Sequence, residues 1–177
     1  MCSIMRYKKN EESALNKIYN ATAELMQEMD YAKINCSMII KRANVSRSTF
    51  YTYFKAKESI ITYICDDIFN RTFKTKTMSA EKQITESFTY FYSKKEIILP
   101  ILNSGSSSIF LQRLRKRLKS IVIELINHGV IGKSNIPLDL KIHQYINGYT
   151  ALLQYYLRHG NDMSPEVVSS YYFAFYK

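Results

Sequence analysis

The sequence predicts an all-α protein in which a small three-helix domain, residues 1–56, precedes a larger helical domain, residues 57–177. Only 5 Gly and 3 Pro occur in 177 residues, and because strands need frequent turns, this scarcity favours long helices. Apolar residues recur at the helical spacings of three and four along most of the chain. The apolar content of 46% is ample for a buried core, so disorder is not expected.

Two amphipathic helices are expected in the first domain. In the segment from about 11 to 29, one continuous stripe is formed by Leu15, Ile18, Ala21, Thr22, Leu25 and Met29. Asn35 can accept a hydrogen bond from a free backbone N–H, which predicts the start of a second helix over 36–43. The residues expected to face inward from this helix are Cys36, Ile39, Ile40 and Ala43.

A tight turn and a short third helix follow. Asn44 tolerates the left-handed conformation that ends a helix, and Ser46 can cap the next one. Phe50 and Phe54 are four residues apart and can both pack inward. The residues left pointing outward near the helix start are Arg47, Ser48, Thr49 and Tyr51. This division is typical of a helix-turn-helix, whose second helix places its N-terminal side chains on DNA base edges.

These residues carry a family resemblance. Residues 45–51, Val-Ser-Arg-Ser-Thr-Phe-Tyr, with Phe54-Lys55 and Lys57-Glu58 after them, resemble the signature of the TetR/AcrR family of bacterial transcriptional regulators. The segment from about 11 to 68 resembles the DNA-binding domain of that family. The resemblance implies a helix-turn-helix domain followed by a helical dimerisation and possible effector-binding domain.

Three residues depart from the family pattern. Asp30 and Asn44 stand where Gly is common, and Ile40 stands where Ala is common. Asp and Asn can adopt the backbone conformation that Gly supplies, so only the larger Ile40 is expected to alter the packing.

The second domain is divided into helices by caps and polar connectors. A helix from Lys57 to about 73 is expected to link the domains, and Ser79 caps the next helix. Pro100 predicts a kink or a break in the short apolar piece 97–102. Further helices are expected over 109–127, after the connector 103–108; over 138–158, after the loop 129–137; and from Ser164-Pro165 onward.

The charge balance favours an anionic partner. The formal net charge is +10 and the pI is near 9.4, and a basic surface attracts a polyanion and releases its counterions. Double-stranded DNA is the expected partner. A membrane-surface protein is the remote alternative, but it needs a continuous basic amphipathic face, and it leaves the capped turn before Arg47 unexplained. The basic run from Arg113 to Lys119 is interpreted as a solvated helix face, with a second nucleic-acid patch as the alternative.

No catalytic residue, metal site or cofactor is expected. The 3 His are isolated, the 3 Cys are irregularly spaced with no His nearby, and no glycine-rich phosphate loop is present. No stretch has the pattern of a secretory signal or the length of a membrane span, and the odd number of cysteines fits a reduced cytoplasm. An enzyme is therefore not expected.

The position of each side chain predicts its role on DNA. Arg47 is long, can donate two parallel hydrogen bonds and lies at the helix start, so it is the candidate for reading a guanine in the major groove. Ser48 and Thr49 are small enough to let the helix approach and to contact bases or a thymine methyl group.

Backbone contacts follow from the resemblance. It implies that Tyr51 and Lys57 hold phosphates, with Thr52 and Tyr53 as neighbouring candidates. Ser37, in the first turn of the second helix, is a further phosphate candidate. The alternative for Tyr51 and Tyr53 is that they pack within the domain and do not contact DNA.

The helix over 138–158 carries apolar residues on two stripes, and the resemblance of 148–166 to one TetR-type subgroup implies pairing of the last two helices with a second subunit. One stripe could face its own domain and the other a partner, and two exposed stripes would leave a monomer with a large apolar patch. The predicted homodimer interface consists of Ile142, Tyr145, Tyr149, Leu152, Leu153, Tyr156, Val168, Tyr172 and Phe175.

An apolar or aromatic small-molecule effector is a further hypothesis from the resemblance. Its candidate pocket, between the fourth and the fifth to seventh helices, is lined by Tyr63, Phe88, Phe91 and Phe110. The alternative is that these four residues are ordinary members of the hydrophobic core.

Together these patterns predict a transcriptional regulator that binds a palindromic operator as a homodimer, with repression as the usual mode of the family it resembles. An activator or co-regulator of the same fold, using a protein partner instead of a small molecule, is the alternative.

Overall fold

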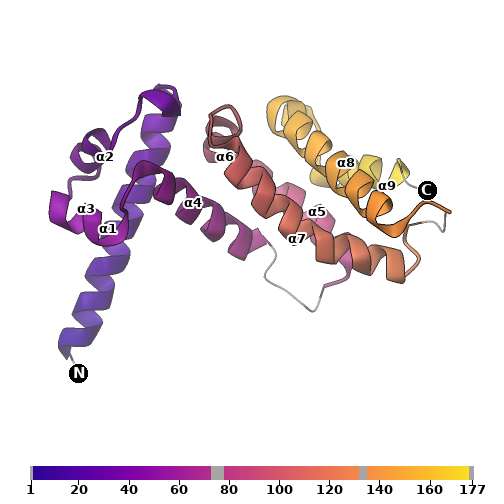
Figure 1. The fold of residues 1–177 in the computed structure, drawn as a ribbon, viewed down its shortest axis with the longest axis horizontal. Helices are drawn as coiled ribbons and strands as arrows, with labels where there is room; N and C mark the ends of the chain where they lie inside the picture. The colour runs from indigo at the N-terminus through magenta and orange to yellow at the C-terminus, as the bar shows by residue number, and fades with distance from the viewer. Residues whose placement is uncertain (1, 73–77, 132–134, 176–177) are drawn as a thin grey trace. The chain divides into compact units, whose positions relative to one another are not determined.

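The fold is all-helical, as predicted. The computed structural model describes residues 2–72, 78–131 and 135–175, with side chains from Ala14 onward, and these residues contain no strand. The helices are α1 (Cys2–Glu28), η1 (Tyr31–Lys33), α2 (Cys36–Ala43), α3 (Arg47–Tyr53), α4 (Lys57–Thr72), α5 (Ala80–Ser93), α6 (Lys95–Leu102), α7 (Ser107–Asn127), α8 (Leu138–His159), η2 (Gly160–Asp162) and α9 (Pro165–Ala174) (Figure 1). Across the described ranges, none of these helices combines the length and apolarity needed to span a bilayer.

The chain forms two compact units. The first comprises Met1–Ile64 and Glu96–Ser107, and the second comprises Cys65–Lys95 and Ser108–Lys177. The division falls inside α4, and the domain boundary proposed from the sequence lies at the start of that helix. The segment 96–107, which contains most of α6, belongs with the N-terminal helices.

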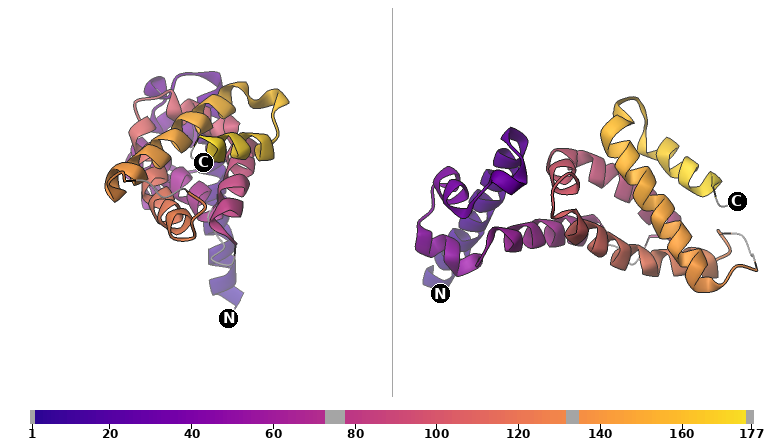
Figure 2. Two further views of the ribbon diagram at one scale, coloured as in Figure 1. Left: turned by 90° about the vertical axis from the view of Figure 1, so that its right-hand side faces the viewer. Right: turned by 45° about the horizontal axis from the view of Figure 1, so that its top comes forward.

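In the first unit, α2 and α3 both pack against α1 (Figure 2). Ile18, Ile39 and Phe50 have no exposed surface and form the centre of this packing. The predicted caps are confirmed: the Asn35 side chain accepts a hydrogen bond from the Met38 N–H, and Asn44 has φ 49° and ψ 51°, the left-handed conformation. The turn between α2 and α3 is therefore fixed by local chemistry.

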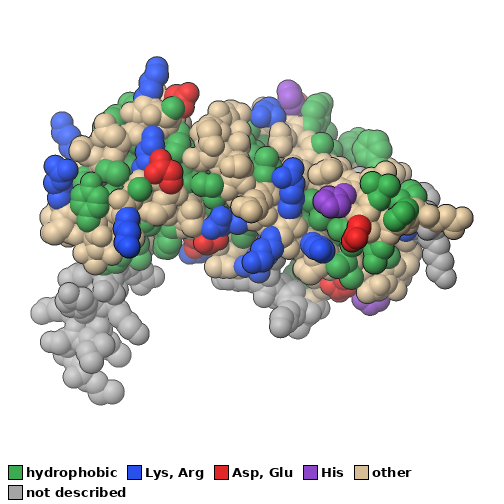
Figure 3. Space-filling view, viewed as in Figure 1, with side chains coloured by type: hydrophobic (Ala, Val, Ile, Leu, Met, Phe, Trp, Pro, Cys, Tyr) green, Lys and Arg blue, Asp and Glu red, His purple; other side chains and the backbone are tan. Residues whose placement is uncertain are grey.

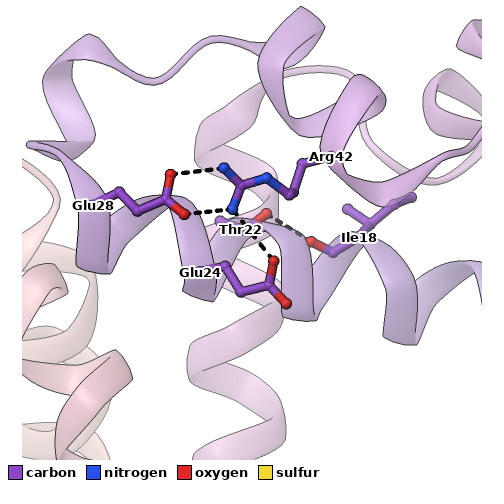
Figure 4. Close-up of polar contacts among 5 residues, drawn as sticks. All are labelled: Ile18, Thr22, Glu24, Glu28 and Arg42. Carbon is purple, nitrogen blue, oxygen red and sulfur yellow. Dashed lines mark hydrogen bonds and ion pairs between the residues drawn. The ribbon is translucent and has the colours of Figure 1, made fainter.

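An ion pair also attaches α2 to α1 (Figure 4). The two terminal nitrogens of Arg42 donate to the two carboxylate oxygens of Glu28, each at 2.7 Å, and one nitrogen lies 3.4 Å from Glu24. The hydrogen bond from Arg42 lowers the pKa of the Glu28 carboxyl. Exposed ion pairs generally contribute little to stability, but a bidentate pair also fixes the relative orientation of its two side chains.

The Lys57 ammonium joins the start of α4 to the turn between α1 and α2. Its nitrogen donates to the carbonyl oxygens of Tyr31, Ala32 and Ile34 at 3.0, 3.3 and 2.8 Å, and it lies 4.7 Å from the centre of the Tyr31 ring. All three donors of the ammonium are thereby used on backbone carbonyls.

The structure bears on two predictions about the middle of the chain. Pro100 does not break its helix: α6 runs from Lys95 to Leu102, and beyond the proline the Asn103 N–H donates to the Leu99 carbonyl at 2.9 Å. A proline removes one backbone hydrogen bond, and neighbouring bonds can maintain the helix. In addition, α7 begins at Ser107, two residues before the expected start.

The core of the second unit is rich in aromatic rings, and α5, α8 and α9 pack together in it (Figure 2). The Phe88 ring stacks on Tyr149 with centres 4.6 Å apart. The Tyr149 hydroxyl is fully buried and lies 2.5 Å from the Ser87 hydroxyl, which satisfies its hydrogen bonding. Burial raises the pKa of Tyr149, which therefore stays protonated at neutral pH.

The expectation that both stripes of α8 are exposed in a single chain is wrong. Most residues of the predicted interface are buried inside their own unit: Ile142, Tyr145, Tyr149, Leu153, Tyr156, Val168 and Tyr172. Leu152 is half-buried, and only Phe175, 77% exposed, is open to a partner. The reason is that α5 and α9 cover both stripes, and a helical pattern does not reveal whether its covering helices come from the same chain.

Replacing Lys57 tests its structural role. We expect Lys57→Met to lower the free energy of unfolding by about 1–3 kcal/mol, because carbonyls of the 31–34 turn lose their donors while the aliphatic stem is kept. The matched control is Lys55→Met, which removes an exposed lysine two residues away. Chemical denaturation followed by circular dichroism gives both values, and equal effects of the two changes would contradict the assignment.

Candidate nucleic-acid interface

The start of α3 is organised by one serine hydroxyl. Ser46 Oγ accepts a hydrogen bond from the Thr49 N–H at 3.0 Å, as predicted for a cap. The same oxygen lies 2.8 Å from the hydroxyl oxygens of both Ser48 and Thr49. These short contacts hold the first turn of the helix in one conformation, so the side chains it displays are fixed before any partner arrives.

The two faces of α3 differ sharply in burial. Phe50 is fully buried and Phe54 is 4% exposed, and their ring centres lie 6.0 Å apart. On the other face, Arg47, Ser48 and Thr52 are exposed, and Tyr51 is 45% exposed. The phenylalanines therefore anchor the helix while the polar face stays accessible, as the sequence predicted.

The remaining predicted contacts occupy different environments. Thr49 and Tyr53 are half-buried, and Ser37 is exposed in the first turn of α2. The Thr52 hydroxyl donates to the Ser48 carbonyl at 2.9 Å, which directs it to its own helix. Tyr51 also packs edge-on against Phe50 with centres 5.3 Å apart, leaving part of the ring open. Ser37, Arg47, Ser48, Tyr51 and Thr52 are thus the exposed members of the predicted set.

Lys57 was predicted to hold a phosphate, and its geometry argues against this. Its three donors are used on the carbonyls of the 31–34 turn, so we assign it a structural role. Two exposed lysines that the sequence reasoning did not name as phosphate contacts are Lys41 in the last turn of α2 and Lys55 just after α3, and the described hydrogen bonds and ion pairs do not occupy their ammonium groups. Lys41 follows Ser37 by four residues on the same helix, a spacing that would have identified it.

The surface around α2 and α3 is rich in positive charge. Figure 3 shows Lys and Arg side chains over this part of the first unit. Arg47, Lys41 and Lys55 are exposed there, whereas Arg42 is committed to Glu28. A polar helix face flanked by cations matches the chemistry of a DNA groove and its phosphates.

Three of the four aromatic residues predicted to line an effector pocket belong to the core of the second unit. Phe88, Phe91 and Phe110 are fully buried in the second unit, and the Phe91 and Phe110 ring centres are 6.0 Å apart. Tyr63 belongs to the first unit, where it packs on Phe54 with ring centres 5.7 Å apart. The burial of Phe88, Phe91 and Phe110 among other side chains of their unit fits the alternative that they are core residues.

Comparison with known proteins agrees with this architecture. A sequence profile described as "Bacterial regulatory proteins, tetR family" matches residues 18–64, and one described as "Transcriptional regulator C-terminal region" matches residues 78–175. The first covers the helix-turn-helix, and the second covers more than half of the chain.

Individual relatives are also regulators. The HTH-type dhaKLM operon transcriptional activator DhaS of Lactococcus lactis is 27% identical over 97 residues, which span 55% of this chain and 46% of DhaS. The match thus spans less than half of that relative.

Among solved structures, a TetR transcriptional regulator from Streptococcus agalactiae superposes with a TM-score of 0.81 at 29% identity, covering 97% of this chain and 98% of the other. A putative TetR-family regulator from Syntrophomonas wolfei shares the fold with a TM-score of 0.72 at 19% identity, over 93% of each chain. The chain therefore belongs to the tetR family of bacterial regulatory proteins.

Proposed function

We propose that this regulator is a homodimeric repressor that binds a palindromic operator in the cytoplasm. The observation that carries the proposal is α3, which presents Arg47, Ser48 and Tyr51 from a capped turn anchored by Phe50. In a dimer with two-fold symmetry, the two α3 helices read inverted half-sites in successive major-groove turns. Occupancy of a promoter by such a dimer excludes polymerase.

The dimer interface of this proposal is the outward side of α8 and α9. Large apolar side chains are exposed there in one stripe along α9 and its C-cap residue. The stripe is formed by Val167, Tyr171 and the C-cap Phe175, which are 39%, 49% and 77% exposed. The outward stripe of α8 consists of Leu140, Gly148, Ala151 and Tyr155. Small residues at its centre let two helices approach closely, and large ones at its ends supply apolar area.

Activation is the second candidate mode. The relative from Lactococcus lactis is named as a transcriptional activator, and three of the four rings predicted for an effector pocket are fully buried in this chain. An activator of this fold binds DNA through the same α3 surface and recruits a protein partner.

One experiment addresses both modes. Selection on randomised DNA yields the operator, and in vitro transcription from a promoter carrying it measures the effect of added protein. A decrease in transcript supports repression, whereas an increase supports activation. Failure to select any sequence over random DNA would contradict the proposal as a whole.

Arg47→Ala tests base reading. Because Arg47 can donate two parallel hydrogen bonds to a guanine, we expect the change to cost about 1–3 kcal/mol on the selected operator and much less on random DNA. Fluorescence anisotropy on both DNAs provides the measurement. An equal loss on both would make Arg47 a backbone contact.

Tyr51→Phe tests backbone holding. Phosphates are the same in every sequence, so loss of the hydroxyl should weaken operator and random DNA alike, by about 0.5–1.5 kcal/mol. The hydroxyl carries no charge, so the salt dependence of binding should not change. DNA-binding isotherms at several salt concentrations test both points. Lys55→Ala is a useful contrast, because loss of an exposed cation that contacts a phosphate should reduce the dependence of DNA affinity on salt. A loss confined to the operator would assign Tyr51 to base reading.

Ala151→Glu tests the dimer. Ala151 lies at the centre of the outward α8 stripe, and an unpaired charge buried in an interface costs about 3–5 kcal/mol. We expect the variant to sediment as a monomer with weakened operator binding, while His143→Glu, an exposed position at the edge of the same helix face, should stay dimeric. A wild-type chain that sediments as a monomer at micromolar concentration would overturn the dimer.

A further inference from the structure

The hydroxyl of Ser46 has more hydrogen-bonding neighbours than it can bond in the same way. Its oxygen accepts the Thr49 N–H at 3.0 Å, and it also lies 2.8 Å from the hydroxyl oxygens of both Ser48 and Thr49. A serine hydroxyl has one proton and two lone pairs. Because the Thr49 N–H occupies one lone pair, one proton and one lone pair remain for two neighbouring hydroxyls.

This proton count gives the two neighbouring hydroxyls opposite roles. When Ser46 donates to one of them, it can only accept from the other. The hydroxyl that accepts from Ser46 keeps its own proton for an outside partner, whereas the hydroxyl that donates to Ser46 has only lone pairs left to offer. The Thr52 hydroxyl does not change the count, because it donates to the Ser48 backbone carbonyl.

We propose that Ser46 is a positioning residue that gives Ser48 and Thr49 opposite hydrogen-bond polarity on DNA. One of the two hydroxyls presents a donor to a base edge, and the other presents an acceptor. A serine or threonine hydroxyl that rotates freely can pair with any base, and the bonds to Ser46 remove this freedom. The inference rests on the proposed function, since it requires α3 to lie in the major groove.

The positions of the two hydroxyls allow them to act on bases. Ser48 is exposed and Thr49 is half-buried, and both lie in the first turn of α3 after Arg47. The next residue, Phe50, is fully buried and holds this turn on the domain. Water can satisfy the open hydroxyl atoms in the free protein, and a base edge replaces that water when the helix enters the groove. The bonds to Ser46 then decide which base edge is accepted.

Ser46→Asp tests the assignment, because aspartate caps a helix as well as serine does but its carboxylate has no proton to donate. Both neighbouring hydroxyls then donate to the carboxylate and present only lone pairs to DNA. One of them therefore reverses its polarity, and the other keeps it. Ser46→Thr retains a hydroxyl with the same proton count, so it should leave the polarity of both neighbours unchanged.

The measurement uses the full chain and the duplex that it selects from randomised DNA. Ser48→Ala and Thr49→Val identify the base pair that each hydroxyl reads, as the pair whose base preference is lost most. At these two base pairs, fluorescence anisotropy gives the ratio of Kd values for G·C and A·T. In Ser46→Asp we expect a shift of about two- to tenfold toward adenine or cytosine, which present amino groups, at one of the two base pairs only. The ratio cancels the uniform repulsion between the new carboxylate and the phosphates.

Two further variants support the measurement. Ser79→Asp is the matched control, because Ser79 caps α5 of the second unit by accepting the Lys82 N–H, and the same change there should leave both ratios unchanged. Ser46→Gly costs little as a helix cap but frees both hydroxyls, so base preference should weaken at both base pairs.

Unchanged ratios in Ser46→Asp, or the same shift at both base pairs, would overturn the role of Ser46 and leave the operator, and with it the proposed function, standing. The role is also overturned if neither Ser48→Ala nor Thr49→Val alters any base preference. A wild-type chain that selects no duplex over random DNA would instead disprove the proposed function, and this inference would fall with it.

Discussion

The geometry of the first unit depends on the ammonium of Lys57. The segment 31–34 turns the chain from α1 to α2, and a turn of this kind leaves carbonyl oxygens without helical partners. One side chain from the start of α4 donates to three carbonyls of this segment, of which only that of Tyr31 also accepts a backbone N–H, from Ile34, among the hydrogen bonds described here. The end of α1, the start of α2 and the start of α4 are thereby held at one point. The helix-turn-helix is built on this frame, since α2 leaves directly from it.

The frame matters because α3 is too short to be stable alone. Helices below roughly 12–15 residues are marginal in water, and α3 has 7. The backbone hydrogen bonds of α3 alone do not stabilise it. The additional stability comes from the burial of Phe50 and Phe54 and from the Ser46 cap. Because the stabilising contacts are all on the inner face and at the first turn, the outer face can vary with little effect on folding. A surface of this kind can be specialised for one DNA sequence without redesign of the domain.

Local features were predictable from the sequence, and features that depend on distant partners were not. The caps at Asn35, Ser46, Ser79 and Ser164 and the left-handed Asn44 are confirmed, because each is decided within four residues of chain. The partners of Lys57 lie 23 to 26 residues away, so no local pattern identifies them. The two stripes of α8 were recognised as apolar, but which helices cover them is a question of tertiary packing. The sequence could not show whether an aromatic residue packs in the core or lines a cavity, because both environments require the same residue types.

Opposite charges on two surfaces of the first unit separate the molecules they attract. The α2 and α3 surface exposes Lys41, Arg47 and Lys55, whereas the hollow between the end of α1, η1 and α6 is lined by carboxylates. A polyanion approaching the first unit is therefore attracted to the surface of α2 and α3 and repelled by the carboxylates beside α6, so the charges favour contact through α3.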